Sequence, residues 1–447
     1  MNNPILNGVM GLVVGDALGV PVEFKDRESL KRDPVTNMRG YGTYNQPPGT
    51  WSDDSSMTLA LLDSLKGGLD YEDIMNKFIS WYDIGEYTPC GKMFDIGIAT
   101  RQALSRYKNG SSALECGGQD EYDNGNGSLM RILPILFYLQ AKFGNDFLDK
   151  DEAFNIIHNI SSLTHGHKRS QIACGIYLSI GSYIMTGMEL NSAVSSGIYN
   201  AIQYYKNKEE FKNELKYFDR IQDKNFKDLS EDKIKSGGYV IDTLEASIWC
   251  LLNTKDYKSC VLKAVSLGGD TDTTGAVAGG LAGLRYGYES IPDEWLEAIA
   301  RREYIENMCK DLYWSLTKSS AEKLLLYIPY FEEMKGKEIS TWTGGGKNPD
   351  GSYTFSYPLY DEKFSDFIDD FHKTNLMTYN YLDIINEAIP NMKLIDEYIA
   401  SADLELLKAI LTGYIRQERF NEGLWEETAS RGIFLKILYR LRELTKN

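Results

Sequence analysis

The sequence lacks the features that mark several common classes of protein. Its six cysteines are scattered through 447 residues with no C-x-x-C pair, as expected of reduced thiols in a cytosolic protein without a zinc-thiolate site. It has no dense block of lysine or arginine, and 64 acidic against 48 basic side chains leave a net charge of −16, so nucleic-acid binding is not expected. The apolar N-terminal stretch is interrupted by Asp16 and Glu23 and is interpreted as a core helix rather than a signal peptide. We therefore expect a cytoplasmic protein that does not bind membranes.

Helical periodicity dominates the first two-thirds of the chain. Apolar residues recur every three to four positions in residues 5–18, 57–65, 130–139, 172–184, 244–252 and 261–265, and no series of alternating strands separates these segments. The main domain is therefore expected to be all-α. Glycines at 11, 15 and 19, and again at 275, 279 and 283, predict two helices in close contact, because a glycine inside a helix costs roughly 0.5–1 kcal/mol relative to alanine.

Two segments depart from this pattern. Residues 206–238 are rich in Lys, Glu and Asp, and are predicted to form a solvated insertion between core helices. In residues 339–357, two short β-prone runs flank a cluster of Gly, Asn, Pro and Asp, which predicts a hairpin with a long turn. Helical character returns at residues 403–447. We expect a domain boundary near Pro329, with one domain over residues 1–328 and a small α+β domain over residues 329–447.

Two acidic motifs lie at the starts of apolar helices more than 200 residues apart. Ser52 is predicted to be an N-cap that places Asp53 and Asp54 in the first turn of one helix. Asp270 and Asp272 lie at the start of another, after glycines that allow a sharp turn. The helix dipole alone, worth ~0.3–1 kcal/mol, explains each pair separately. Brought together by the fold, however, four carboxylates would repel one another strongly unless cations neutralised them.

The donor atoms of the two motifs indicate the kind of cation. They are all oxygens, with no Cys or His, which suits Mg²⁺, Mn²⁺ or Ca²⁺ and disfavours zinc and copper. Two Mg²⁺ or Mn²⁺ ions are expected, because a pair ~3.5–4 Å apart can orient a substrate and polarise an oxygen or a bound water.

Over about residues 4–320 the chain resembles the ADP-ribosylglycohydrolase family. The resemblance rests on five motifs in order: residues 15–23 (GDALGVPVE), 51–55 (WSDDS), 94–97 (FDIG), 125–131 (GNGSLMR) and 268–273 (GGDTDT). It implies an all-α orthogonal helical bundle with a binuclear Mg²⁺ or Mn²⁺ centre, which cleaves the bond joining C1 of ADP-ribose to an acceptor.

The same resemblance implies roles for individual residues. Either Asp95 or Glu23 is the acid/base, and both alternatives stay open. The backbone of the loop before Met130 would hold the diphosphate at a helix N-terminus, with His165 beside the nucleotide. The residues that would bind ADP-ribose are Gly125, Asn126, Gly127, Ser128, Met130 and His165. The metal ligands would be Ser52, Asp53, Asp54, Asp270, Asp272 and Thr273.

The C-terminal region resembles a small bacterial family of unknown function, through Tyr357, Pro358 and Tyr360 and through residues 416–425 (RQERFNEGLW). This resemblance implies no activity. Its arginines and Trp425 are interpreted as a solvated helix face packed by one tryptophan, with a recognition patch for an anion or a modified acceptor as the alternative.

The sequence as a whole predicts a metal-dependent hydrolase that removes ADP-ribose from an ADP-ribosylated acceptor and releases ADP-ribose as a product. A protein side chain is the first-choice acceptor and a small molecule the second. The competing hypothesis is a non-catalytic ADP-ribose-binding or structural module of the same fold. The presence of every acidic position of the motifs argues against that module.

Overall fold

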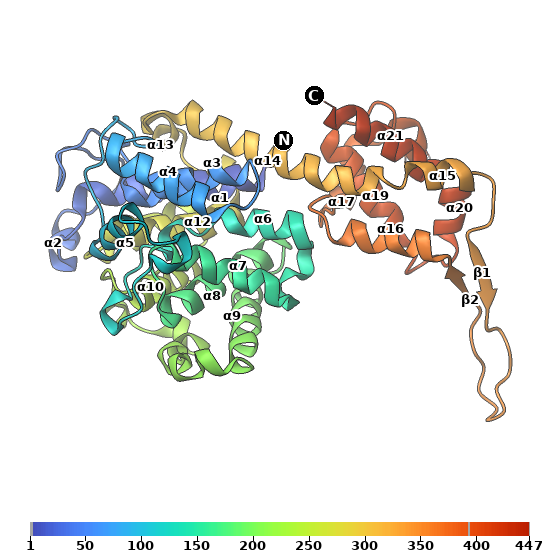
Figure 1. Ribbon diagram of the computed structural model, residues 1–447, viewed down its shortest axis with the longest axis horizontal. Helices are drawn as coiled ribbons and strands as arrows, with labels where there is room; N and C mark the ends of the chain where they lie inside the picture. Colours follow the sequence, from blue (N-terminus) through green and yellow to red (C-terminus); the bar gives the residue numbers. More distant parts are fainter. Residues whose placement is uncertain (1–2, 392–393, 447) are drawn as a thin grey trace. The chain divides into compact units, whose positions relative to one another are not determined.

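The computed structural model describes residues 3–391 and 394–446 and divides into two compact units. The large unit comprises Asn3–Tyr138 and Leu148–Tyr313, and the small unit comprises Leu139–Phe147 and the chain from Trp314 onward. Within the described residues almost all regular structure is helical, and the strands form one two-stranded sheet in the small unit (Figure 1). The expected all-α bundle followed by a small α+β region is therefore confirmed.

The large unit is built from helices joined by short loops and 3-10 turns, and the periodic segments of the sequence fall within them. Its α-helices are α1 (Pro4–Gly19), α2 (Arg27–Arg32), α3 (Asp53–Leu65), α4 (Tyr71–Ile84), α5 (Ile98–Lys108), α7 (Asp151–Ser162), α8 (Lys168–Met185), α9 (Leu190–Lys206), α10 (Val240–Leu252), α11 (Tyr257–Ser266), α12 (Thr271–Tyr286) and α13 (Asp293–Ala298). Helices α6 (Pro134–Phe143) and α14 (Arg302–Leu325) run from one unit into the other along the chain.

Helices α1 and α12 form the central pair of the large unit, and their glycines permit the contact. A Cβ atom on Gly15 would lie 2.1 Å from the carbonyl oxygen of Gly275, and one on Gly11 would lie 2.4 Å from that of Gly279. Only helices without side chains at these positions can approach so closely. The predicted close packing of the two glycine series is confirmed.

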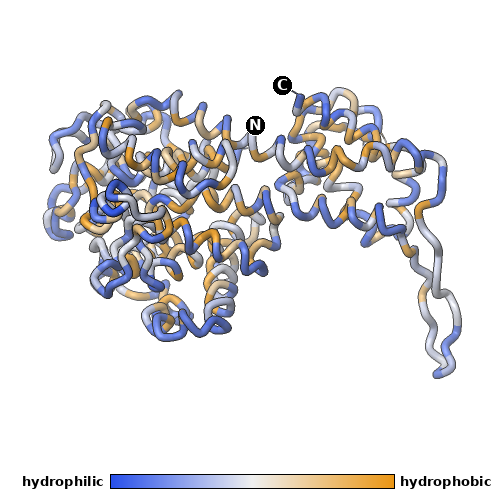
Figure 2. Tube along the Cα trace, viewed as in Figure 1, coloured by the Kyte–Doolittle hydropathy of each residue, from blue (hydrophilic) through white to orange (hydrophobic). Residues whose placement is uncertain are grey.

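The N-terminal helix is part of the core. The stretch Pro4–Val22 is long and apolar enough to cross a membrane by length and composition, but 89% of it is buried inside the protein. Hydrophobic residues concentrate in the parts of the helices that lie inside the unit, and hydrophilic residues concentrate on its outer turns (Figure 2). Burial of this apolar surface drives folding of the large unit.

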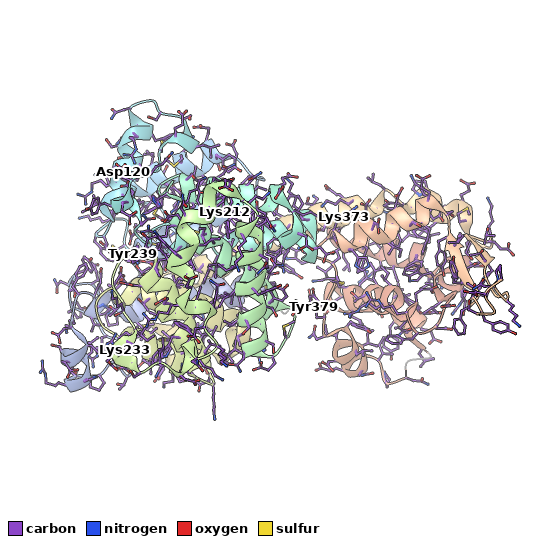
Figure 3. All side chains as sticks on the ribbon, turned by 90° about the horizontal axis from the view of Figure 1, so that it is seen from below. Asp120, Lys212, Lys233, Tyr239, Lys373 and Tyr379 are labelled. Carbon is purple, nitrogen blue, oxygen red and sulfur yellow. The ribbon has the colours of Figure 1, made fainter. Side chains whose placement is uncertain are left out.

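The charged insertion is built from 3-10 turns rather than from regular helices. Residues 206–238 form a series of 3-10 turns, η6 (Glu209–Phe218), η7 (Arg220–Gln222), η8 (Phe226–Asp228) and η9 (Glu231–Lys233). Phe211, Phe218 and Phe226 anchor these turns in the core, while charged side chains such as Lys212 and Lys233 are exposed (Figure 3). The predicted insertion exists, but scattered aromatic anchors rather than a helical stripe hold it in place.

The small unit has a hairpin and a helical core. Strands β1 (Ser340–Thr343) and β2 (Tyr357–Tyr360) pair antiparallel, with Ser340 opposite Tyr360, so the predicted hairpin is confirmed. Trp425 packs against Tyr360 and Phe364, and Arg431 pairs with acidic neighbours, so this region is a packed helix face. The helices are α15 (Ile328–Met334), α16 (Glu362–His372), α17 (Tyr381–Ala388), α18 (Ile395–Tyr398), α19 (Leu404–Gln417), α20 (Leu424–Ser430) and α21 (Ile433–Thr445).

Candidate metal centre and active site

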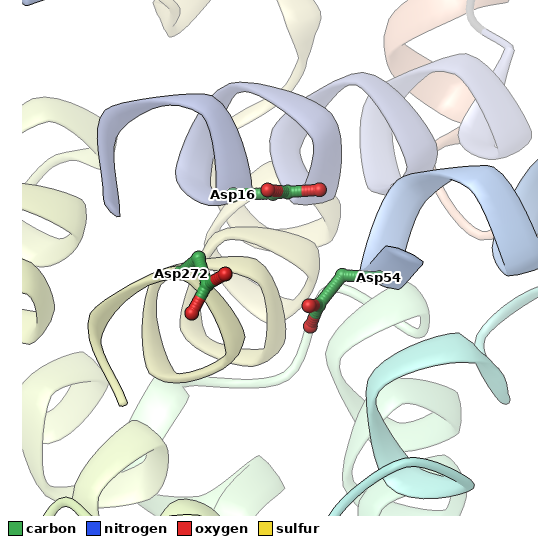
Figure 4. A group of neighbouring side chains, drawn as sticks. All are labelled: Asp16, Asp54 and Asp272. Carbon is green, nitrogen blue, oxygen red and sulfur yellow. The ribbon is translucent and has the colours of Figure 1, made fainter. Parts of the chain in front are cut away.

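Three carboxylates from three helices meet in the core of the large unit. Asp16 near the end of α1, Asp54 in the first turn of α3 and Asp272 in the first turn of α12 each offer an oxygen, and these oxygens all lie within 4.8 Å of one another. Figure 4 shows the three side chains as neighbours, one from each helix. All three residues are no more than 1% exposed. The two acidic motifs, far apart in sequence, therefore occupy one site.

A second group of carboxylates adjoins the first and shares Asp272 with it. Glu23 follows the 3-10 turn η1 (Val20–Val22), and Asp95 lies in the loop before α5. One oxygen from each of Glu23, Asp95 and Asp272 lies within 4.8 Å of the other two. Both acid/base candidates thus lie beside the candidate metal ligands.

The remaining candidate ligands lie around the same cluster. The Ser52 hydroxyl donates to Asp54 Oδ2 at 3.0 Å, and the Thr273 hydroxyl donates to the same oxygen at 3.3 Å. Asp53 is buried beside these groups, and this burial raises its pKa, followed by the charges of Asp95, Asp16, Glu23 and Asp270. The candidate ligands therefore gather around one cluster, although Asp53 and Asp270 are not among the carboxylates whose oxygens lie within 4.8 Å of one another. Their roles as ligands remain predictions.

Local structure explains how the two motifs reach the site. Ser52 is the N-cap of α3, as predicted, and its hydroxyl accepts from the backbone N–H of Asp54. Gly268 and Gly269 adopt φ values of 73° and 75°, a left-handed conformation that favours glycine. Gly269 also exchanges two backbone hydrogen bonds with the segment after Glu23, since it accepts from Phe24 (2.7 Å) and donates to Lys25 (2.9 Å). These two hydrogen bonds connect the loop that carries Glu23 to the second acidic motif, which contains Asp270 and Asp272.

The electrostatics of the cluster are unfavourable without a cation. Burial, reinforced by the neighbouring carboxylates, raises the pKa of Asp53, Asp54 and Asp272 well above the usual range. Burial and then the charge of Asp95 raise the pKa of Glu23 to about 8. No ion pair among the described residues includes any of these carboxylates. Crowded anions of this kind need an external positive charge.

Unpartnered oxygens show that the donor set fits a divalent metal. Asp54 Oδ1, Asp270 Oδ1 and Glu23 Oε2 are buried and have no hydrogen-bond partner. Buried polar atoms are normally satisfied, so three such oxygens in one site indicate that another group completes it. The donors are carboxylate and hydroxyl oxygens, which suit Mg²⁺ or Mn²⁺.

Asp16 contributes in a different way from the other carboxylates. Both of its oxygens accept the backbone N–H of Ser52, at 3.0 and 3.1 Å, and Oδ2 also accepts the N–H and the hydroxyl of Ser55. Asp16 therefore ties the start of α3 to α1. The sequence offered a signal for it, a lone aspartate in an apolar helix, but Asp16 was not among the predicted site residues.

The glycine-containing loop lies next to the same cluster. Asn126 Nδ2 donates to Asp270 Oδ2 and to the Thr243 hydroxyl, both at 2.9 Å, so this side chain supports the second metal motif. A Cβ on Gly127 would lie 2.7 Å from Cε1 of His165, which shows how closely the loop covers that ring. Burial lowers the pKa of His165 to about 3, so the imidazole is neutral. The predicted roles of these residues toward ADP-ribose are not tested.

The helix expected to start at Met130 starts later in the chain. Residues Leu129–Arg131 form a single 3-10 turn, and α6 starts only at Pro134. Pro134 provides the physical reason, because proline is favoured at a helix start and disfavours helical geometry at the residue before it. Ser128 is fully buried and its hydroxyl accepts a hydrogen bond from Ser161, so its side chain serves the core.

Tyr44 is a site residue that the sequence did not reveal. Burial raises the pKa of both Glu23 and Asp95, and the Tyr44 hydroxyl lies close enough to the two carboxyls to act against that rise. It lies in a loop without periodicity or a recognisable motif, so no pattern in one sequence distinguishes it from the other tyrosines.

Comparison with known proteins identifies relatives of this chain. Residues 2–322 match the ADP-ribosylglycohydrolase family, and residues 316–447 match a family of unknown function, DUF6508. The chain is 33% identical to the ADP-ribosylarginine hydrolase Tri1 of Serratia proteamaculans over 309 residues, which covers 68% of this chain and 78% of that protein. It is 30% identical to the ADP-ribosyl-[dinitrogen reductase] glycohydrolase of Rhodospirillum rubrum over 298 residues, or 66% of this chain and 89% of that one.

A solved structure supports the same assignment. The ADP-ribosylglycohydrolase-related protein complex aligns with a TM-score of 0.56 and 30% identity, over 70% of this chain and 98% of that chain. The expectation of a catalytic protein is thus confirmed over that of a non-catalytic module. The chain belongs to the ADP-ribosylglycohydrolase family and is a glycohydrolase enzyme.

Proposed function

We propose that this protein hydrolyses the bond between C1 of ADP-ribose and an arginine side chain of a modified protein, with the help of two divalent cations. The observation that carries the proposal is the meeting of Asp54 and Asp272 with Glu23 and Asp95 in one site whose oxygens lack partners. The relatives named as an ADP-ribosylarginine hydrolase and as a dinitrogen reductase glycohydrolase support an arginine on a protein as the acceptor.

The two acidic motifs would hold the cations. Asp53, Asp54, Asp270 and Asp272 supply carboxylates, and Ser52 and Thr273 supply hydroxyls. Bound divalent cations supply positive charge that orients ribose hydroxyls and polarises the oxygen of a water. Asp16 and Asn126 keep Ser52 and Asp270 in place by the hydrogen bonds described above.

The carboxyls of Glu23 and Asp95 handle the protons of the reaction. Water forms a bond to C1 as the bond from C1 to the guanidine nitrogen breaks. An ionised carboxylate takes a proton from the water, and a carboxyl that carries a proton donates it to the leaving nitrogen. We keep both Asp95 and Glu23 as candidates for the main acid/base. Substitution of each to its amide, followed by measurement of kcat, decides between them.

The loop at residues 125–128 is the proposed binding site for the diphosphate of ADP-ribose. The backbone N–H of Asn126 already donates to Gly238, which leaves Gly125, Gly127 and Ser128 to supply donors. The His165 ring lies against the two glycines and would support the loop beneath the nucleotide. Met130, which is 3% exposed, follows the loop and would shape the floor of the site.

Release of ADP-ribose from defined substrates tests the proposal. Purified protein is incubated with ADP-ribosyl-arginine and ADP-ribosyl-serine peptides in Mg²⁺, in Mn²⁺ and in EDTA, and free ADP-ribose is quantified by chromatography. We expect release from the arginine substrate with either metal and none in EDTA. Release from the serine peptide alone would replace the acceptor, and release at full rate in EDTA would reject the metal centre.

The domain boundary and the cellular location are also part of the proposal. We place the catalytic domain at residues 1–328 and a domain of unknown role at residues 329–447. We also propose a cytoplasmic location, which agrees with the free state of all six cysteines.

A further inference from the structure

Tyr44 lies where the two acid/base candidates meet. Its hydroxyl lies beside both carboxyls, whose oxygens lie within 4.8 Å of each other. A phenol has one O–H to donate, while its oxygen can accept another hydrogen bond. The Tyr44 hydroxyl is therefore placed to serve as one common hydrogen-bond partner for Glu23 and Asp95.

The tyrosine is itself held from both sides of the site. Its ring packs against Phe94, the residue before Asp95, with ring centroids 5.1 Å apart. The neighbouring residue Thr43 donates its backbone N–H to Pro21 at 3.1 Å and its hydroxyl to the carbonyl oxygen of Glu23 at 2.8 Å. Tyr44 thus links the loop that carries Glu23 to the loop that carries Asp95, about 70 positions away in sequence.

Close backbone packing reinforces this link. A Cβ on Gly42 would lie 1.8 Å from the carbonyl oxygen of Pro21, so the loop before Tyr44 lies directly on η1. Beyond η1, the backbone N–H of Phe24 donates to the carbonyl oxygen of Gly269. This bond connects the loop that carries Glu23 to the second acidic motif. Tyr44 is half-buried and lies between these fixed points, so its hydroxyl has a defined position.

We propose that Tyr44 is a positioning residue of the hydrolase, whose hydroxyl aligns the carboxyls of Glu23 and Asp95 for proton transfer to and from the substrate. This inference rests on the proposed function for its kinetic consequence. Its structural consequence, an ordered Glu23 loop, does not depend on turnover.

The test uses Tyr44→Phe, which keeps the ring on Phe94 and removes only the hydroxyl. Tyr41→Phe is the matched control, because Tyr41 lies in the same loop and its side chain is 68% exposed. We expect Tyr44→Phe to lower kcat on ADP-ribosyl-arginine at least tenfold with KM and Mn²⁺ affinity within threefold of the starting protein. Tyr41→Phe is expected to stay within twofold in all three.

Hydrogen exchange supplies a readout that needs no activity. Mass spectrometry of the peptide that spans residues 20–26 follows the amide of Phe24, and we expect at least tenfold faster exchange in Tyr44→Phe than in the starting protein or in Tyr41→Phe. A kcat within twofold, or unchanged exchange, would overturn the positioning role. If the starting protein releases no ADP-ribose from any acceptor, the proposed function fails, and the exchange measurement alone still decides whether Tyr44 orders the loop.

Discussion

Asp272 is the single residue shared by both carboxylate groups. We predict that Asp272→Asn weakens Mn²⁺ binding at least 100-fold and abolishes release of ADP-ribose, because the amide carries no charge for the cation. In EDTA the same variant should melt at a higher temperature than the starting protein. Burial raises the pKa of Asp272, so folding without metal must protonate it or bury its charge at neutral pH, and an amide avoids that cost. Calorimetry with and without Mn²⁺ measures both effects.

A surface aspartate provides the comparison for this experiment. Asp311 lies exposed on α14, and Asp311→Asn should leave metal affinity, turnover and both melting temperatures unchanged. Full hydrolysis by Asp272→Asn, or a lower melting temperature in EDTA, would show that Asp272 does not belong to a crowded metal centre.

His158 should make the stability of the large unit depend on pH. Burial, followed by the charges of Lys168 and Lys208, lowers its pKa to about 3, and Nε2 hydrogen-bonds to the Tyr205 hydroxyl at 3.0 Å. The folded pKa is depressed below the ordinary 6.5, so between these values the unfolded chain binds more protons and stability falls as pH falls.

The size of this effect can be isolated with one variant. From pH 7.0 to 5.5, His158 should cost the folded state about 1 kcal/mol. In His158→Gln, which retains a hydrogen-bonding group for Tyr205, the loss over this interval should be smaller than in the starting protein by that amount. Urea denaturation at the two pH values measures the difference, and equal losses in both proteins would contradict the prediction.

At the residue scale, the sequence identified the acidic candidate ligands better than the residues that support them. Asp53, Asp54, Asp270 and Asp272 carry a local signal, since each lies at the start of an apolar helix. Asp16, Asn126 and Tyr44 act through contacts with residues distant in sequence. Such long-range hydrogen bonds leave no periodic trace in a single chain.

At the scale of elements, the contact between α1 and α12 sets the geometry of the centre. Asp16 and Asp272 lie on these two helices, and a Cβ on Gly19 would lie 2.3 Å from the Cα of Asp272. The glycine series therefore brings one ligand motif next to the helix that anchors the other. A side chain in this contact would separate the helices and displace the carboxylates.

We predict that Gly15→Ala destabilises the large unit by about 3 kcal/mol or more, the upper range for overpacking, because its Cβ would meet the Gly275 backbone. Gly8→Ala on the same helix is the matched control. The Gly8 Cβ would meet only side-chain carbons of Leu133 and Leu284, at 3.1 and 3.0 Å, which can move. Urea denaturation compares the two, and equal effects would show that the backbone contact is not limiting.

Elements with a regular apolar period were predictable, and those without one were not. The segments within α3, α8, α10 and α11 are predictable from the regular spacing of their apolar residues. The insertion at residues 206–238 and the turn at Leu129–Arg131 are 3-10 structure, whose short length and different period give no such stripe. The local structure of such segments therefore could not be predicted from the sequence.

At the scale of the whole molecule, every candidate ligand belongs to one compact unit. The six candidate ligands, together with Asp16, Glu23 and Asp95, all lie in the large unit, and none of them comes from the small unit. A ligand that binds only the folded state of one unit stabilises that unit by RT ln(1 + [L]/Kd), or about 2.7 kcal/mol at 100 times Kd. The effect reaches another unit only if the two unfold together.

We therefore predict two calorimetric transitions, of which Mn²⁺ raises one by a few degrees and leaves the other in place. Asp272→Asn serves as the internal control, because it should abolish the shift without merging the transitions. The responsive transition is assigned with Gly15→Ala, which should lower the same one. A single transition that moves as a whole with Mn²⁺ would show that the two units unfold cooperatively, because the metal would then stabilise residues that contribute no ligand.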